Sequence, residues 1–220
     1  MPFLPTTKTE LRDLGWDRLD VILVSGDSYI DSPYMGTAVM GRVLSDAGFR
    51  VGIIAQPDVS SGKDITRLGL PRLFWGVSAG AVDSMVANYT ATGRRRKSDD
   101  YTPGGINNRR PDRAVIVYTN LIKRHFKGSR IPIVLGGIEA SLRRISHYDF
   151  TSDSIRRSIL FDSKADLLVY GMGEKSAVGL ARAMDAGTEY RGIRGICYIS
   201  GKKPDEYMDC LLYTSDAADE

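Results

Sequence analysis

The stretch DVILVSG, residues 20–26, is a continuous apolar run that ends in a glycine. Such a run is typical of a strand that is covered on both faces. The segment MGTAVMGRVLSDAG, residues 35–48, has apolar residues at the spacing of one helix face, and RVGIIAQP, residues 50–57, reads as a second strand. Strand, helix and strand together predict a β-α-β unit with parallel strands.

The same alternation continues along the chain. Upstream, Thr7 and Glu10 match a capping box, which predicts a short helix as far as about Leu14. We therefore expect one α/β domain with a doubly wound, mainly parallel sheet and helices on both faces. The further strands are predicted at residues 73–80, 131–137, 165–171 and 193–200, the further helices at 81–89, 111–126 and 174–187, and a long irregular insertion at 90–112.

The composition is that of a globular protein, with 42% hydrophobic and 26% charged residues in a chain of 220. No apolar run approaches the ~20 residues of a membrane span, and the start lacks the pattern of a secretory signal, so we expect a cytoplasmic protein without membrane contact. A net charge of +3 does not by itself imply nucleic acid. Two cysteines argue against a disulfide framework and against a self-contained thiolate metal site, so no metal site is expected.

Glycine and polar residues follow four of the predicted strands. Ligands bind at the carboxyl ends of parallel strands, where loops converge and helix N-termini present free N–H groups. Tight turns and helix caps explain any one such loop, but four of them on one edge predict a shared cleft. The candidate cofactor-binding residues in these loops are Gly26, Asp27, Gly136, Gly137, Ser141, Gly171 and Gly173.

Nucleotide and cobalamin motifs can be checked by their spacing. The segment GMGEKS, residues 171–176, has the first two glycines of a dinucleotide fingerprint but a serine in place of the third, and no G-x-x-x-x-G-K-[ST] occurs. A Rossmann dehydrogenase and a P-loop NTPase are therefore disfavoured. No histidine lies near Asp27 or Asp31 in the manner of a cobalt-ligating D-x-H-x-x-G motif. A module that binds cobalamin without a protein histidine, or a nucleotide, stays open.

The segment VLGGIEASLRRISHYDF, residues 134–150, combines a strand end with a predicted helix start. Ile138, Leu142 and Ile145 are spaced to pack the new helix on the sheet. This leaves the candidate catalytic residues outside or toward the cleft: Glu139, Arg143, Arg144 and His147. Glu139 and Arg143 are also placed as an ordinary i,i+4 ion pair. We expect the helix start and the arginines to favour an anionic group, and His147 to hold or shuttle a proton.

A basic run, Arg94-Arg95-Arg96-Lys97, lies in the long insertion, with Arg109 and Arg110 beyond it. Such a run could hold phosphates or nucleic acid. Charge runs are more often solvated loop surface, and neighbouring aspartates partly neutralise this one. An RNA-binding accessory protein is therefore a minor alternative.

Several long phrases resemble the N-terminal region of YgiQ-type radical SAM proteins. They are GWDRLDVILVSGDSYIDSP, GFRVGIIAQPD, DSMVANYTA, YTPGG, RPDRAVIVYT, GGIEASLRRISHYDF and DSKADLLVYGMGE. The similarity runs from about residue 3 to about residue 204. It implies a cobalamin-binding-like, flavodoxin-like domain ahead of a radical SAM barrel that holds a [4Fe-4S] cluster and S-adenosylmethionine.

The resemblance also implies that the cysteines that bind the iron-sulfur cluster lie outside this chain. The cluster needs a C-x-x-x-C-x-x-C triplet, whereas Cys197 and Cys210 stand alone, so no cluster is expected here. The domain would cover the barrel and shape its substrate site. The tail CLLYTSDAADE, residues 210–220, departs from the family and resembles translated transposase-adapter sequence. We therefore expect a domain at 1–209, a non-native tail, and a natural protein that continues past Asp209 into the barrel.

Overall fold

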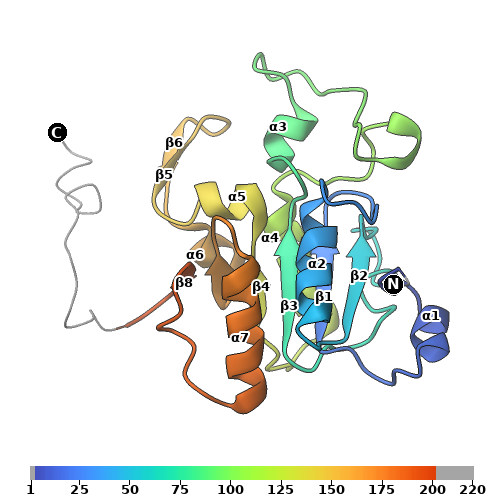
Figure 1. The fold of residues 1–220 in the computed structure, drawn as a ribbon. Coiled ribbons are helices and arrows are strands. Elements are labelled where there is room, and N and C mark those ends of the chain that lie inside the picture. The colour runs from blue at the N-terminus through green and yellow to red at the C-terminus, as the bar shows by residue number, and fades with distance from the viewer. Residues whose placement is uncertain (1–2, 202–220) are drawn as a thin grey trace.

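The computed structural model describes residues 3–201 and shows a six-stranded sheet between layers of helices (Figure 1). The strand order is β2-β1-β3-β4-β7-β8, the flavodoxin-like order extended by one strand. The strands of this sheet are β1 (Val21–Ser25), β2 (Val51–Ala55), β3 (Phe74–Ser78), β4 (Ile133–Leu135), β7 (Leu167–Val169) and β8 (Ile196–Tyr198). The predicted doubly wound, mainly parallel α/β fold is confirmed.

All five residues of β1 are buried, as expected for a central strand with helices on both faces. It pairs in parallel with β2 and with β3, so that Val21 lies beside both Val51 and Phe74. The edge strand β8 runs antiparallel to β7, with Cys197 opposite Leu168. Sequence alternation alone did not indicate this reversal, because β8 follows α7 as a parallel strand would.

The helices of the two layers cover separate hydrophobic cores. Leu23, Phe74 and Val134 pack on the face covered by α2 and α7, whereas Ile22, Trp75 and Leu135 pack on the face covered by α4 and α6 (Figure 1). The helices are α1 (Lys8–Asp13), α2 (Gly36–Asp46), α3 (Ser84–Asn88), α4 (Ala114–His125), α5 (Gly137–Leu142), α6 (Ile159–Ser163) and α7 (Glu174–Ala186), with a 3-10 turn at Pro103–Gly105. None of the helices in residues 3–201 has the length and apolar character that crossing a membrane requires.

Local sequence signals set the ends of two helices. The predicted capping box at α1 is present, with Thr7 accepting from the Glu10 N–H and Glu10 accepting from the Thr7 N–H. Helix α7 ends at Gly187, whose φ of 65° is the left-handed conformation that glycine adopts without a steric penalty.

An ion-pair cluster joins three strands at the amino edge of the sheet. The Asp20 carboxylate accepts hydrogen bonds from the Arg50 side chain at 3.0 and 3.2 Å and from Arg72 Nε at 2.8 Å. Because these residues lie one or two positions before β1, β2 and β3, the cluster fixes the relative position of the three strand starts.

The segment after β4 differs from its prediction. Helix α5 is only six residues long, and a separate two-stranded hairpin follows, made of β5 (His147–Asp149) and β6 (Ser154–Arg156). The predicted packing of Ile138 and Leu142 on the sheet is wrong, because these side chains are 47% and 61% exposed. Glu139 is buried in their place, since two backbone N–H groups inside the protein require an acceptor there.

Candidate functional site

A cavity of about 410 Å³ lies at the carboxyl ends of β1, β3, β4 and β7, between the sheet and helices α2 and α7. The loops after these four strands all contribute to it, which is the geometry of a switch-point site in a doubly wound sheet. We call it the carboxyl-edge cavity. Its loop lining comprises Asp27, Pro33 and Tyr34 after β1, Gly80 and Ala81 after β3, Gly136 and Gly137 after β4, and Gly171, Met172 and Gly173 after β7.

The inner wall of the cavity is apolar. Leu23, Phe74, Val134 and Val169 line it from the strands, and Met40 lines it from α2. An apolar wall with a few polar groups at the mouth is typical of sites for small organic ligands. The cavity therefore suits a ligand that buries an apolar body against the sheet.

At two positions around the cavity mouth, neighbouring atoms lie so close to the backbone that only glycine fits. Gly137 has a φ of +79°, and a β-carbon there would lie 2.5 Å from the Ser78 hydroxyl. Gly80 has a φ of +108°, and a β-carbon there would lie 2.1 Å from the Asp27 carboxylate. Side chains at these positions would be strained and would clash, so the mouth keeps its shape only with glycine.

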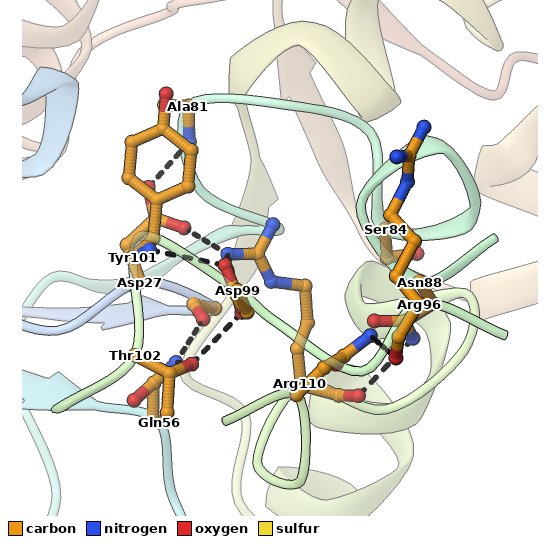
Figure 2. Close-up of polar contacts among 12 residues, drawn as sticks. Asp27, Gln56, Ala81, Ser84, Asn88, Arg96, Asp99, Tyr101, Thr102 and Arg110 are labelled. Atoms are coloured by element: carbon orange, nitrogen blue, oxygen red, sulfur yellow. Dashed lines mark hydrogen bonds and ion pairs between the residues drawn. The ribbon is translucent and has the colours of Figure 1, made fainter. Parts of the chain in front are cut away.

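Asp27 is the buried acid of the cavity, with a relative exposure of 2%. Its Oδ1 accepts from Arg110 Nη2 at 2.6 Å, and its Oδ2 accepts from the Ala81 N–H at 2.6 Å (Figure 2). Arg110 Nη2 also lies 3.3 Å from Asp99 Oδ2, so two buried carboxylates share one guanidinium. Burial raises the pKa of Asp27, and this effect outweighs the lowering by Ala81 and Arg110.

The long insertion supplies most of this network. Thr102 Oγ1 donates to Asp99 Oδ2 at 2.8 Å, and Gln56 Nε2 donates to Thr102 Oγ1 at 2.7 Å (Figure 2). The Ser28 N–H donates to the Tyr101 carbonyl at 2.9 Å. The insertion is therefore folded against the loop that carries Asp27. Sequence reasoning missed the Arg110 and Asp99 roles, because no local spacing connects them to Asp27.

The candidate catalytic residues lie elsewhere. Glu139 accepts from the Ser84 N–H at 2.8 Å and the Val115 N–H at 3.1 Å, so it caps the starts of α3 and α4 instead of facing the cleft. The expected Glu139–Arg143 pair is replaced by an Arg143–Asp83 ion pair. Glu139, Arg143 and His147 share a separate cavity of about 10 Å³. That volume admits a water molecule at most.

The other predicted residues divide between the cavity and the fold. Asp27, Gly136, Gly137, Gly171 and Gly173 line the carboxyl-edge cavity. Gly26 and Ser141 are not among its lining residues: a β-carbon on Gly26 would lie 2.1 Å from the Ala79 carbonyl oxygen, and the Ser141 carbonyl accepts from Arg144 at 2.7 Å. The Arg144 guanidinium lies 4.9 Å from the centre of the Tyr170 ring, and His147 Nδ1 lies 3.1 Å from the Ile145 carbonyl.

Part of the basic run stabilises the insertion itself. Arg96 Nε donates to the Val86 and Tyr89 carbonyls at 3.2 and 3.1 Å, and Arg95 lies over the Tyr89 ring. Arg110 is buried. These contacts leave fewer cations for a nucleic-acid surface than the sequence indicates.

Residues 3–201 contain one cysteine, Cys197. Over this part of the chain, no three His, Cys, Asp or Glu side chains are grouped to hold a metal ion. Cys197, the free cysteine in the described residues, is half-buried in β8, and burial raises the pKa of its thiol. Cys210 and the rest of the 210–220 tail lie outside the described residues.

Comparisons with known proteins agree with this architecture. The family described as "Radical SAM N-terminal" matches residues 3–219. A UPF0313 protein of Fusobacterium nucleatum is 55% identical over 220 residues, which are 100% of this chain and 39% of that protein. A UPF0313 protein of Thermotoga maritima is 59% identical over 214 residues, covering 96% of this chain and 37% of that protein. The chain thus spans about two fifths or less of these relatives.

A solved structure shares the fold. The radical S-adenosylmethionine methyltransferase TsrM of Kitasatospora setae, determined with cobalamin and a [4Fe-4S] cluster bound, matches with a TM-score of 0.50 and 20% sequence identity. The match covers 82% of this chain and 27% of that chain.

Proposed function

Because this chain belongs to the radical SAM N-terminal family, we propose that it covers a radical SAM barrel in a longer protein and shapes the site where that protein binds its substrate. The position of the carboxyl-edge cavity carries this proposal. The cavity opens at the edge where the four loops meet, and a barrel placed over that edge would close it. The length of the curated relatives leaves room for such a barrel.

The surface around the cavity mouth supports a covering role. Tyr34, Leu142 and Met172 are 91%, 61% and 87% exposed, although each is a large apolar side chain. Tyr34 and Met172 line the mouth itself, and Leu142 ends α5, which begins at the mouth. Apolar side chains that form a patch on a surface mark contact sites, and these three lie on the two loops and the helix that meet at the mouth. We refer to Tyr34, Leu142 and Met172 as the mouth residues.

The iron-sulfur cluster belongs to the proposed barrel. A [4Fe-4S] cluster is held by thiolates close together. Residues 3–201 contain one cysteine, Cys197, so this part of the chain does not fit the cluster. In the longer protein, the cluster and S-adenosylmethionine would supply radical chemistry, and the present domain would position the substrate and exclude water from it.

Cobalamin is a second candidate ligand, which the fold shared with cobalamin-bound TsrM favours. The apolar wall of the cavity offers a surface against which a flat group of a corrinoid would lie. Any such binding would lack a histidine from the loop after β1, since His125 ends α4 and His147 lies in the small separate cavity. Incubating the chain with hydroxocobalamin and recording the spectrum after gel filtration tests this candidate. A colourless protein would reject it.

The covering role can be tested with the part of a related protein that lies beyond the region matched by this chain. The part of the Thermotoga maritima protein beyond the matched region, produced separately with its cluster reconstituted, is titrated with this chain by calorimetry. We expect binding that Met172→Glu and Leu142→Glu each weaken about tenfold or more. Ala186→Glu is the control, because Ala186 is exposed and lies at the end of α7 opposite to the end that begins at the mouth. No binding, or equal binding by all variants, would contradict the proposal.

A further inference from the structure

The charged side chains that line the carboxyl-edge cavity are both acids. Within residues 3–201, Asp27 and Glu174 are the acidic lining residues, Tyr34 adds a phenol, and no lysine, arginine or histidine side chain lines the cavity. Arg143 and Arg144, which the sequence predicts to favour an anion, are not among the residues that line this cavity. Arg143 pairs with Asp83, and Arg144 lies over Tyr170.

The network around Asp27 carries an excess of negative charge. Asp27 and Asp99 share Arg110, so two carboxylates face one guanidinium. Asp27 is the member of this group that reaches the cavity lining. Each of its oxygens accepts one hydrogen bond from the protein, and a carboxylate oxygen can accept two, so a ligand donor has acceptor sites left.

Three helix starts at the cavity do not reverse this balance. Helices α2, α5 and α7 begin there, at Gly36, Gly137 and Glu174, and none of them has a side-chain cap. A helix start carries roughly half a positive charge. Glu174 itself lies in the first turn of α7 and offsets that charge. Asp27, which is buried and has a full charge when ionised, remains the dominant group facing the interior.

We propose that the carboxyl-edge cavity binds an organic cation. The apolar body of this ligand lies against Leu23, Phe74 and Val134, and its ammonium or other positively charged group lies at Asp27, with Glu174 as the second acid of the lining. Charge-assisted hydrogen bonds to a desolvated carboxylate are stronger than neutral ones, which makes the charge the basis of selection. This inference rests on the proposed function, in which the cavity is a ligand site.

Three probes with one apolar body test the charge preference. The full chain is titrated with 1-naphthylmethylamine, 1-naphthalenemethanol and 1-naphthoate by saturation-transfer NMR and calorimetry. We expect the amine to bind about tenfold more tightly than the alcohol, equivalent to about 1.4 kcal/mol, and the acid to bind most weakly.

Substitutions of the two lining acids test which residues cause the preference for the amine. Glu174→Gln and Asp27→Asn should each reduce the ratio of amine to alcohol affinity at least about threefold, with Glu189→Gln, an exposed acid beyond the end of α7, as the unchanged control. Circular dichroism checks the fold of Asp27→Asn, and Glu174→Gln is the variant that leaves the buried network intact. Gly136→Leu should weaken all three probes, because Gly136 lines the cavity and has no neighbour within 3.4 Å of a β-carbon.

The outcomes separate this proposal from the proposed function. Equal binding of all three probes that Gly136→Leu abolishes would overturn the cation preference and keep the cavity as a ligand site. Tighter binding of the acid, or an amine preference that survives both acid variants, would also overturn it. Failure of all three probes to bind would reject the cation site, whereas the barrel titration with the mouth variants judges the covering role independently.

Discussion

Arg110 and Asp27, which are 83 residues apart in the chain, form a buried ion pair in which Nη2 donates to Oδ1 over 2.6 Å. Arg110 comes from the end of the long insertion, and Asp27 lines the carboxyl-edge cavity. The pair therefore ties the insertion to the wall of the cavity. It also means that the acid facing a ligand is held in place by a residue that does not line the cavity.

Replacing Arg110 with methionine should destabilise the protein by about 3 kcal/mol, because it leaves two buried carboxylates without their cation. The loss should shrink as the pH falls, since burial raises the pKa of Asp27 and protonation of Asp27 removes one of the unpaired charges. Urea unfolding at several pH values measures both effects. Arg109→Met, at the exposed neighbouring position, is the control. A loss below about 1 kcal/mol would show that the pair is dispensable.

Gly137→Ala should cost about 1–3 kcal/mol of stability, because alanine is strained at a φ of +79° and its methyl group would meet the Ser78 hydroxyl at 2.5 Å. Gly136→Ala is the matched control. Its backbone is extended, and its nearest neighbour to a β-carbon is 3.9 Å away. Thermal unfolding of the two variants gives the comparison, and equal melting temperatures would rule out the close contact.

Glu139→Ala should destabilise the chain by about 2 kcal/mol or more, since it leaves the buried N–H groups of Ser84 and Val115 without an acceptor. Glu139→Gln, which keeps one acceptor oxygen, should lose less. Urea midpoints measure the difference. Because the side chain lies outside the carboxyl-edge cavity, 1-naphthylmethylamine should bind equally well to folded Glu139→Gln and to the unmodified protein. A clear loss of affinity would show that Glu139 takes part in ligand binding.

The Asp20 cluster predicts a defined acid sensitivity. Burial favours the neutral acid, but hydrogen bonds from Arg50 and Arg72 lower the pKa of Asp20 from 3.8 to about 2. A folded pKa below the ordinary one means that the carboxylate contributes stability above about pH 4, and that this contribution disappears as the pH falls through about 2. The stability difference between the protein and Asp20→Asn should therefore be constant near neutral pH and decline below about pH 4. A difference that is independent of pH would contradict this assignment.

Much of the fold was predictable because buried strands and amphipathic helices leave periodic patterns. The β1 run and the α2 face gave the parallel core, and the parallel topology itself brings four loops to one edge. The reversal of β8 and the burial of Glu139 were not predictable, because each depends on which groups meet in three dimensions. The Asp27–Arg110 ion pair was not predicted from the sequence for the same reason. The packing predicted for Ile138 and Leu142 was wrong because helical spacing shows that side chains share a face but does not show what that face contacts.

The covering role is tested most directly by hydrogen exchange. Amide exchange in this chain is recorded by mass spectrometry with and without the remaining part of the Thermotoga maritima relative. The account predicts slower exchange around the mouth residues Tyr34, Leu142 and Met172, and unchanged exchange at the opposite edge around Asp20 and Arg72. Protection at that opposite edge, or no protection at the mouth, would contradict it.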